Sequence, residues 1–388
     1  MSENAQKPRI RFKGFSDAWE QRKLSDIAER FDNLRIPVAA NLRIAGSTPY
    51  YGANGIQDYV DGYTHDGEFV LVAEDGANDL KNYPVQYVKG RIWVNNHAHV
   101  LQGKAKILDN SFLTYVINQA DIESLLVGCG RAKLNAETMM NIVLPIPAIK
   151  EQQIIGCCLS KLDNLITLHQ RKYDKLVAVK KALLEKMFPA DGETVPKIRF
   201  KGFSDAWEQR KLEILITEYK RTVDSGCTYP VLSSSKTEGV VLQEEHFGRK
   251  QQHDITGYNI LPRNYCTYRN RSDGVDFTFN VNNCCDIGII SKFYPVFYGN
   301  NNDTFFLSLL LNNSDEVVHE IAYTCTGTGQ KVLSFLDLQK MFIKIPTYIE
   351  QRKISTLFRK IDNLITLHQR QLEKLKNIKS ALLEKMFV

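Results

Sequence analysis

Two long stretches of the chain show the spacing of paired helices. They run from about Ile149 to Phe188 and from Ile349 to Val388, and neither contains a proline. Within them, similar residues recur at alternating steps of four and three, which is typical of an α-helix that packs one narrow face against another helix. At 1.5 Å per residue, each helix would be about 57 Å long. We call the recurring positions the seam; they are Leu162, Ile166, His169, Tyr173, Leu176, Lys180, Leu183 and Met187 in the first helix and Ile361, Ile365, His368, Leu372, Leu375, Lys379, Leu382 and Met386 in the second.

The seam is apolar except for a histidine and a lysine at matching places in each helix. Polar residues on such a face lower stability but fix the register and the number of partners. Because no acid or thiol accompanies His169 or His368 at helical spacing, we expect both histidines to be structural. The helices match in length, so we expect each to pair with the other. The seam alone fits a parallel or an antiparallel pair.

The rest of the chain has the shorter alternation of β-strands. Residues 25–145 and 213–344 contain short stretches rich in β-branched and aromatic residues, such as EFVLVA, RIWVNNHAHVL and VVLQ. Turn signals such as YYGANGI and NRSDG separate them. Two later segments, 111–118 and 303–312, suit helices. The pattern predicts an α+β fold with two strand-rich domains and two long helices.

Several stretches of the sequence occur twice. IRFKGFSDAWEQRKL begins at Ile10 and again at Ile198, and LDNLITLHQR from Leu162 returns with one change from Ile361. ALLEKMF closes both helical stretches, and an Ile-Pro pair followed by Glu-Gln opens both. The two halves of the chain therefore share their ends and differ in their middles.

The order of these repeats is circular. In the centre of the chain, the first helix leads through the linker PADGETVP into the second IRFKGFSDAWEQRKL copy. Joining the chain ends would recreate this junction, so we expect the termini to lie close together and a pseudo-twofold axis to relate the halves. The expected domains are 1–148 (lead-in and first strand-rich domain), 149–195 (long helix and linker), 196–347 (second strand-rich domain) and 348–388 (long helix).

Composition narrows the class of protein. The chain has 388 residues with 43% hydrophobic content, which suits two to three globular domains. No apolar run is long enough for a bilayer and the N-terminus is polar, so we expect a cytoplasmic protein with no membrane partner. The eight cysteines form no C-x-x-C pair, which favours reduced, structural thiols. A net charge of +6 permits a polyanionic partner without requiring one.

Both middles are rich in hydrogen-bonding side chains beside glycines in loops. Such side chains bind base edges and phosphates, and glycine lets the backbone approach closely. Turn or surface roles would account for more than half of them. The candidates are Tyr51, Asn54, Asn95, Asn96, His97, His99, Arg131 and Lys133 in the first middle and Ser233, Ser234, Ser235, Lys236, Tyr268, Arg269, Asn270, Arg271, Lys292, Gln330 and Lys331 in the second.

No sequence motif indicates catalysis. Phosphate loops, nucleophile elbows and metalloprotease motifs are absent from the sequence. His97 and His99 would face the same side of a strand, but no third ligand has a suitable spacing, so we expect no metal. We therefore expect a chain without enzymatic activity.

The repeated features resemble the specificity subunit (HsdS) of type I restriction-modification systems. The resemblance covers the whole chain. It rests on the order of variable and repeated regions, the helix entries IPAIKEQQI and IPTYIEQRKI, and the G-x-G shortly before each entry. PYYGANGIQDYVDGY and NNHAHVL resemble one type of target recognition domain, and VLSSSKTEGV and DIGIISKFYPVF resemble another.

The resemblance implies a function and partners. Each middle would be a target recognition domain that reads one half of a bipartite, asymmetric site in double-stranded DNA, and the helices would run antiparallel and set the spacer. Two methyltransferase subunits would dock on the repeated regions, and two restriction/translocase subunits would join through them. S-adenosylmethionine, ATP and magnesium are then expected on those partners, with no cofactor in this chain.

The identical lead-in IRFKGFSDAWEQRKL is not expected to read bases, because the two DNA halves differ. Its bulky residues would pack each domain onto the helices or onto a methyltransferase subunit. Two alternatives remain open: a coiled-coil scaffold whose strand-rich domains bind proteins or glycans, and an enzyme with an unfamiliar site. The repeats define an architecture and leave the ligand undecided.

Overall fold

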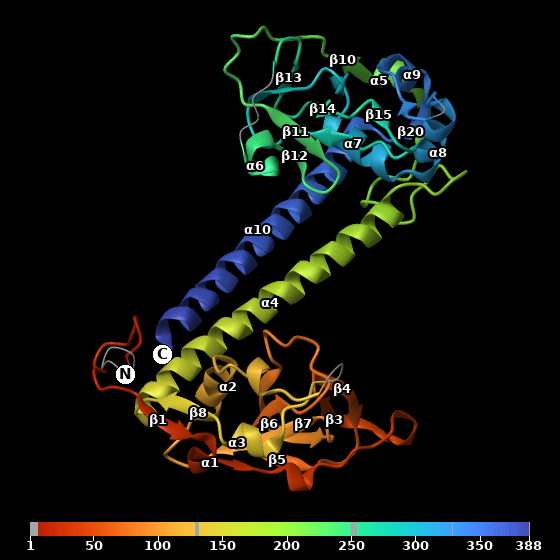
Figure 1. Cartoon of the computed structure of the whole chain (residues 1–388). Coiled ribbons are helices and arrows are strands. Elements are labelled where there is room, and N and C mark those ends of the chain that lie inside the picture. The colour runs from red at the N-terminus through yellow and green to blue at the C-terminus, as the bar shows by residue number, and fades with distance from the viewer. Residues whose placement is uncertain (1–6, 129–131, 250–253, 328, 388) are drawn as a thin grey trace. The chain divides into compact units, whose positions relative to one another are not determined.

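The computed structural model describes residues 7–128, 132–249, 254–327 and 329–387. The chain divides into two compact units, of which unit 1 comprises Met1–Arg171 and Gln369–Val388 and unit 2 comprises Lys172–His368 (Figure 1). The division falls inside the two long helices. Each unit therefore contains the beginning of one long helix and the end of the other.

The long helices begin and end close to where the sequence predicts. Helix α4 spans Ile149–Met187 and helix α10 spans Tyr348–Met386, and each has 39 residues. All of the seam side chains are half-buried or buried, whereas most of the residues between them are exposed. This is the exposure pattern of helices that pack along one face.

Within each unit, the two helix segments run in opposite directions. In unit 1, Lys379 of α10 forms an ion pair with Asp163 of α4 at 2.6 Å, and further along α10 Met386 joins the core that contains Ile155 of α4. In unit 2, Lys180 of α4 forms an ion pair with Asp362 of α10 at 2.7 Å. Each seam lysine thus meets the aspartate of the repeated helical motif, and the expected antiparallel arrangement is confirmed.

Unit 1 is built on a sheet that has six strands within the described residues. The strand order is β2-β7-β5-β6-β3-β4, and the pairs are antiparallel except for β3 with β6. The stretch RIWVNNHAHVL, which the pattern groups as one element, forms two strands because residues 95–97 make a tight turn. The strands are β2 (Ala28–Arg30), β3 (Ala45–Gly52), β4 (Gly55–Val60), β5 (His65–Ala73), β6 (Val85–Val94) and β7 (Ala98–Gly103).

Shorter elements connect this sheet to the lead-in. Helix α2 (Asn110–Asn118) begins at Asp109, whose carboxylate accepts a hydrogen bond from the Phe112 amide, so the predicted helix has a conventional N-cap. The lead-in forms β1, which pairs with β8 just before α4. The remaining elements are β1 (Glu20–Lys23), α1 (Leu24–Ile27), η2 (Asp32–Leu34), η3 (Ala40–Leu42), η4 (Glu123–Leu125), α3 (Ala136–Met140) and β8 (Val143–Ile146).

Unit 2 has smaller sheets. Its largest sheet has the order β10-β18-β14-β16, and four two-stranded sheets surround it within the described residues. The strands are β9 (Glu208–Lys211), β10 (Ile216–Glu218), β11 (Leu232–Ser235), β12 (Gly239–Leu242), β13 (Asn259–Pro262), β14 (Cys266–Thr267), β15 (Arg271–Ser272), β16 (Asn280–Val281), β17 (Ile287–Ile290), β18 (Val296–Gly299), β19 (Lys331–Val332) and β20 (Phe342–Ile345).

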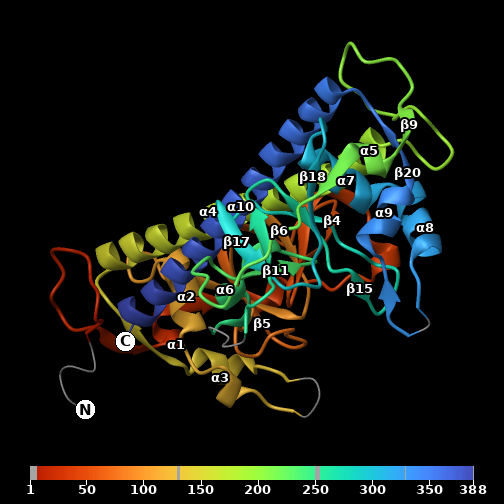
Figure 2. The ribbon, with the colours of Figure 1, turned by 90° about the horizontal axis from the view of Figure 1, so that it is seen from above.

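The helices of unit 2 lie around these sheets. Helix α7 is N-capped by Asp303, as α2 is by Asp109 in unit 1. Helices α8 and α9 lie next to each other beside β20 in both views (Figures 1 and 2). The helices are α5 (Leu212–Leu215), α6 (Gln243–Phe247), α7 (Thr304–Asn313), α8 (Asp315–Thr324) and α9 (Phe335–Lys340). The units therefore repeat the elements nearest the long helices and differ in their sheets, and the predicted α+β class is confirmed.

The core of each unit includes the end of a long helix. In unit 1, Trp19 packs against Phe112 and against Phe387, which follows α10. In unit 2, Trp207 packs in the same way against Phe306 and against Phe188, which follows α4. The lead-in tryptophans are therefore internal packing residues.

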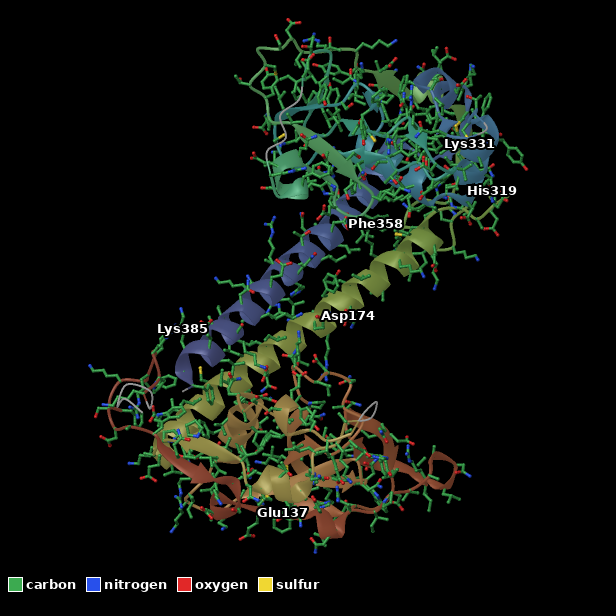
Figure 3. The ribbon with its side chains drawn as sticks, in the orientation of Figure 1. Glu137, Asp174, His319, Lys331, Phe358 and Lys385 are labelled. Atoms are coloured by element: carbon green, nitrogen blue, oxygen red, sulfur yellow. The ribbon has the colours of Figure 1, made fainter. Side chains whose placement is uncertain are left out.

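The lead-in also pairs with the helix ends through the backbone. The Ile10 amide donates to the carbonyl oxygen of Lys385 at 2.9 Å, and the Ile198 amide donates to that of Lys186 at 2.8 Å. Figure 3 marks Lys385 at the end of α10. Residues near the two ends of the described chain therefore contact each other in unit 1. The residues on either side of the central linker make the same contact in unit 2.

Two further observations concern the described residues as a whole. None of the helices among them combines the length and the apolar character needed to cross a membrane. The cysteines described there, which exclude Cys129, are free thiols.

Candidate nucleic-acid interface

In unit 1, the candidate residues meet where the strands of the sheet end. The Asn95 amide donates to the carbonyl oxygen of Tyr51 at 3.1 Å, and the His97 amide donates to Oδ1 of Asn95 at 2.9 Å. The Asn54 side chain donates to the Gly76 carbonyl oxygen at 2.9 Å. Turns that are far apart in the sequence thus form one polar surface.

These residues differ in how much of them solvent can reach. Asn54, Asn96 and Lys133 are exposed, and Tyr51 and His97 are half-buried. Asn95 and His99 are buried, so their side chains offer little surface to a ligand and serve contacts within the unit. Arg131 lies outside the described residues. The exposed and half-buried group remains the predicted contact surface of unit 1, which we call the unit 1 loop surface: Tyr51, Asn54, Asn96, His97 and Lys133.

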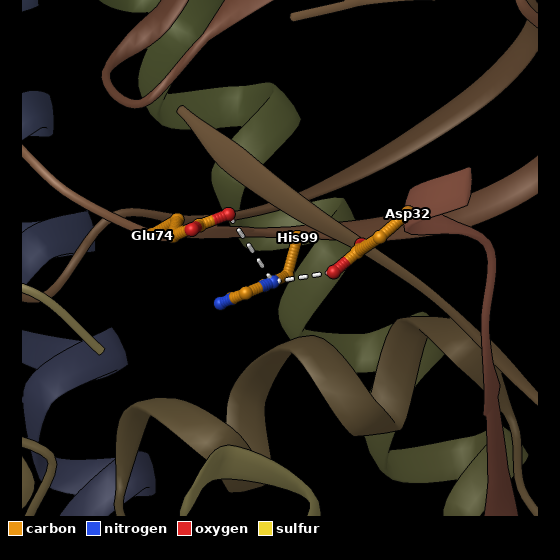
Figure 4. A group of neighbouring side chains, drawn as sticks. All are labelled: Asp32, Glu74 and His99. Atoms are coloured by element: carbon orange, nitrogen blue, oxygen red, sulfur yellow. Dashed lines mark hydrogen bonds and ion pairs between the residues drawn. The ribbon is translucent and has the colours of Figure 1, made fainter. Parts of the chain in front are cut away.

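His99 belongs to a buried ionic network beneath this surface (Figure 4). Its Nδ1 lies 2.7 Å from Oδ2 of Asp32 and 3.7 Å from Oε2 of Glu74, and its Nε2 lies 2.9 Å from the carbonyl oxygen of Leu134. Both ring nitrogens of His99 therefore lie within hydrogen-bonding distance of an oxygen. The network ties Leu134, and with it the exposed Lys133, to the sheet.

Three basic side chains also belong to the network, one of which is Arg30, 3.7 Å from Asp32. Arg35 lies 2.6 Å from Glu74 and 3.6 Å from Asp32, and Lys133 lies 2.9 Å from Glu74. Although burial raises the pKa of Asp32, its hydrogen bond from His99 and the nearby Arg35 charge hold that pKa below the ordinary value. The pKa of Glu74 is likewise lowered, because hydrogen bonds from Arg35 and Lys133 outweigh burial.

The same network contains a group of side chains of the kinds that bind metal ions. Ligand atoms of Asp32, Glu74 and His99 lie within 4.8 Å of one another, so the fold brings His99 two carboxylates that the spacing of the sequence did not indicate. The Arg35 guanidinium already lies between those carboxylates. In this structure the carboxylates of Asp32 and Glu74 are thus engaged in ion pairs with basic side chains, and the network supports the unit 1 loop surface.

In unit 2, the candidate residues gather around a cleft of about 440 Å³. The cleft carries charges of both signs, because arginines and a lysine share it with two aspartates. Candidates Ser234, Lys236, Arg269 and Arg271 line it directly. We call this site the unit 2 cleft; its lining is Ser234, Lys236, Arg269, Arg271, Ser272, Asp273, Gly274, Asp276, Phe277, Thr278 and Tyr294.

Other candidates lie at the border of the unit 2 cleft. Gln330 donates to Asp273 at 3.4 Å, and Lys331 on β19 pairs with Ser272 on β15 (Figure 3 marks Lys331). The Arg271 guanidinium lies over the Phe293 ring, and Lys292 lies over the same ring at 5.8 Å. Sequence reasoning missed Asp273, Asp276 and Phe293, although the turn signal NRSDG contains the first of them.

The four remaining candidates in unit 2 are buried or half-buried. Tyr268 is buried and donates through its hydroxyl to the Leu333 carbonyl oxygen at 3.1 Å, and burial raises its pKa. Ser233, Ser235 and Asn270 are half-buried. Tyr268 therefore holds the segment that bears Arg269 and Arg271 against the core.

The repeated Glu-Gln pair joins each domain to its long helix. Glu151 receives two hydrogen bonds from Arg11 of the lead-in, at 2.7 and 2.8 Å, and Glu350 receives two of the same lengths from Arg199. We call these two contacts the lead-in clamps. Both carboxylates are buried, which makes the clamps bidentate and largely shielded from water.

The glutamine of each Glu-Gln pair contacts the domain of the same unit, whereas the glutamate contacts the lead-in. Gln152 accepts from the Asp109 amide and donates to the Ile107 carbonyl oxygen, and Gln351 accepts from the Asp303 amide and donates to Asn302. Because Asp109 and Asp303 also cap the domain helices α2 and α7, the pair fixes lead-in, domain and long helix together in each unit.

A groove on each unit lies beside the lead-in clamp. In unit 1 it is mostly apolar, and in unit 2 it is bordered by more basic residues. The unit 1 groove is lined by Phe12, Lys150, Gln153, Ile154, Cys157, Cys158, Lys161, Leu162, Leu165, Ile378 and Leu382, and the unit 2 groove by Phe200, Tyr348, Ile349, Arg352, Lys353, Thr356, Leu357 and Lys360. Unlike the tryptophans, the repeated Phe12 and Phe200 are thus available to a partner.

The chain has two unlike domains, and the same residues clamp each of them to a long helix. Each domain bears its own polar loop surface or cleft. These features define a class of two-domain binding proteins built on paired helices. A family model described as the type I restriction modification DNA specificity domain matches residues 16–178 and 217–377. The two matches cover most of the chain, and the chain belongs to this family.

Known proteins resemble the chain in parts and over its whole length. A putative type I restriction enzyme specificity subunit from Haemophilus influenzae is 46% identical over 146 residues, which span 38% of this chain and 38% of that protein. The type I restriction enzyme MjaVIII specificity subunit from Methanocaldococcus jannaschii is 23% identical over 400 residues, covering 94% of this chain and 91% of that protein.

A solved structure shares the fold. The S subunit of a type I restriction-modification system from M. genitalium aligns over 98% of this chain and 99% of its own, with a TM-score of 0.63 and 13% sequence identity. The arrangement of two strand-rich domains and two long helices is therefore also found in an experimentally determined structure.

Proposed function

We propose that this chain is the DNA-specificity subunit of a type I restriction-modification complex and that each unit reads one half of a bipartite, asymmetric DNA site. The observation that carries the proposal is that one chain holds two copies of the family's DNA specificity domain, with repeated clamps and unlike surfaces. The repeated clamps fit two domains that belong to one shared assembly. The unlike surfaces of these domains fit the recognition of two different DNA sequences.

The chemistry of both surfaces supports DNA as the ligand. Amides, imidazoles and hydroxyls of the unit 1 loop surface hydrogen-bond to base edges, and arginines of the unit 2 cleft pair with guanine or with phosphates. The net charge of +6 permits a polyanionic partner, and its excess of basic residues lies on the two long helices. Contacts of this kind would make binding sensitive to salt.

The paired helices are proposed to set the distance between the two half-sites. Two half-sites separated by unread base pairs need a rigid spacer, because a flexible one would not hold both units in register. A helix of 39 residues is about 58 Å long at 1.5 Å per residue. The seam and its Lys-Asp pairs would keep that spacer rigid.

The repeated regions are proposed to dock the partner subunits. Two methyltransferase subunits would contact the two grooves, where Phe12 and Phe200 occupy matching places, and two restriction/translocase subunits would join through them. The chain itself would have no catalytic centre. S-adenosylmethionine, ATP and magnesium would be bound by the partners.

Methylome sequencing of cells that carry this subunit with its methyltransferase partner tests the proposal. We expect one methylated motif with two defined blocks and an undefined gap. Exchanging residues 25–145 for the corresponding domain of another family member should change one block and leave the other unchanged. A single continuous block would contradict two-part reading, and an assembled complex that does not bind DNA would favour a protein-binding or glycan-binding scaffold.

A further inference from the structure

We propose that the unit 2 cleft reads a C·G base pair, with Asp276 accepting from the N4 amino group of cytosine and Arg271 donating to O6 and N7 of guanine. The inference rests on the proposed function, since it assigns a base pair to the half-site of unit 2. It adds two specificity-determining residues, of which sequence reasoning named only Arg271.

The mixed charge of the unit 2 cleft supports the reading of a base pair. A cleft that bound only phosphates would need cations and would be weakened by carboxylates, because phosphates are anions. This cleft holds Asp273 and Asp276 among Lys236, Arg269 and Arg271. In the major groove, a C·G pair presents a donor on cytosine next to two acceptors on guanine, which is the complement of a carboxylate beside a guanidinium.

The position of Asp276 is the second argument. The Ser272 hydroxyl donates to the Asp276 carbonyl oxygen at 3.2 Å and accepts from the Gly274 amide at 3.4 Å, so the turn that bears Asp276 is held in shape. Lys236 donates to Oδ2 of Asp276, and a carboxylate can accept more than one hydrogen bond. The Asp276 side chain is 71% exposed, so a base edge can reach it.

The position of Arg271 is the third argument. Its backbone is held by the pairing of β15 with β19, where Arg271 lies opposite Val332. Its guanidinium lies 4.9 Å from the centre of the Phe293 ring, and such stacking limits the freedom of the side chain. A restrained guanidinium loses less entropy when it makes the two parallel hydrogen bonds that guanine accepts.

Alanine variants of the assembled subunit and methyltransferase complex test the inference. Asp276→Ala and Arg271→Ala are compared with Asp286→Ala and Arg263→Ala, which alter an exposed aspartate-arginine pair of the same unit outside the cleft. Each complex is used to select from DNA libraries in which every position of the half-site of unit 2 is randomised. That half-site is the block left unchanged when residues 25–145 are exchanged. The affinity for one fixed site is also measured at several salt concentrations.

We expect both cleft variants to relax the same C·G position, with discrimination against other pairs falling about tenfold or more, while the control variants keep the wild-type motif. Uniform weakening at all positions with a smaller salt dependence would show phosphate contacts instead and overturn the inference. So would relaxation at an A·T position, or an unchanged motif. If the wild-type complex selects no two-block motif at all, the proposed function itself fails, and the two failures are thereby distinguished.

Discussion

Glu151 and Glu350 are buried carboxylates at the beginning of the long helices. Each is neutralised by one arginine from the lead-in, through two hydrogen bonds. The sequence suggested that the Glu-Gln pair was important because it occurs twice after Ile-Pro. It gave no sign of the partners, because Arg11 and Arg199 are more than a hundred residues away from the glutamates that they contact.

Removing a lead-in clamp should destabilise its unit. We expect Arg11→Met to lower the free energy of unfolding by about 3–5 kcal/mol, because it leaves the Glu151 charge buried without a partner. Urea denaturation followed by circular dichroism measures the change. Arg9→Met, which alters an exposed arginine of the same segment, is the control and should change stability by less than about 0.5 kcal/mol. Equal effects of the two variants would contradict a role for the clamp.

The network around His99 predicts how stability depends on pH. The pKa values of Asp32 and Glu74 are lowered in the folded chain, so the stability that they contribute is present above their ordinary values of 3.8 and 4.5 and is lost as the pH falls through the lowered values. We expect Asp32→Asn to be less stable than wild type at neutral pH and to lose less stability on acidification. Chemical denaturation between pH 7 and pH 3 compares the two, and parallel curves would contradict the prediction.

Individual site residues were predictable only in part. The polar loop residues were found from their types and from neighbouring glycines, and many of them do meet on one surface of each unit. Burial could not be foreseen for Asn95, His99 and Tyr268, because long-range strand pairing decides which side of a turn faces the core. The aspartates of the unit 2 cleft follow Arg271 closely in the sequence, but they were missed because the stretch was interpreted as a turn and only the fold shows that it lines a cleft.

At the scale of elements, the seam was the most predictable feature of the molecule. A spacing of four and three over the 26 residues from Leu162 to Met187, repeated from Ile361 to Met386, specifies both a helix and its buried face. The role of the seam lysines needed the structure, because Lys180 and Lys379 find Asp362 and Asp163 only if the helices are antiparallel. The strands were less predictable, since the short pairs of unit 2 depend on residues far apart in the chain.

The seam ion pairs can be tested by a double-mutant cycle. Lys180→Glu should destabilise unit 2 by placing two negative charges together, and the double variant Lys180→Glu with Asp362→Lys should recover the loss. We expect a coupling energy of about 0.5–1 kcal/mol, because both side chains are partly exposed to solvent. Unfolding in urea at low and high salt measures the coupling. Additive effects of the two substitutions would contradict the pairing.

The length of the long helices yields a prediction that follows from the proposed function. One heptad inserted at the middle of both helices adds about 10 Å, which corresponds to about three base pairs of DNA. We expect the unread gap of the methylated motif to lengthen or recognition to be lost, as read by methylome sequencing. Insertion into α4 alone should abolish recognition, because it breaks the match between the helices. An unchanged gap would show that the helices do not set the spacing.

At the scale of the whole molecule, the chain is organised as a circle opened at one place. The hydrogen bond between Ile10 and Lys385 repeats the one between Ile198 and Lys186. The segments near the two chain ends are therefore held together in the same way as the segments on either side of the central linker. The repeats predicted this arrangement from sequence. The unlike sheets of the two units were not predictable, because nothing repeats between the middles.

A circular permutant should therefore fold and keep its target. In this permutant, a second PADGETVP segment links Phe387 to Arg9, and the chain is opened between Asp191 and Gly192. The former chain ends then form the central linker, and the former linker provides the new chain ends. We expect stability within about 1 kcal/mol of wild type, because Gly192 lies in open space and the contacts of both units are kept. Urea denaturation and the methylated motif are compared with those of the parent. Opening the chain within α2 is the control and should prevent folding of unit 1.

The position of Met386 and Phe387 in the core of unit 1 has a consequence for synthesis on the ribosome. Most of unit 1 is translated first, yet its core lacks these two side chains until all of unit 2 has been made. Unit 2 is drawn from one continuous segment and has its complete core earlier. Because domains fold as they emerge from the ribosome, unit 2 can complete its core before unit 1 does. The Trp19 side chain of unit 1 lacks its packing partner Phe387 until unit 2 has been made.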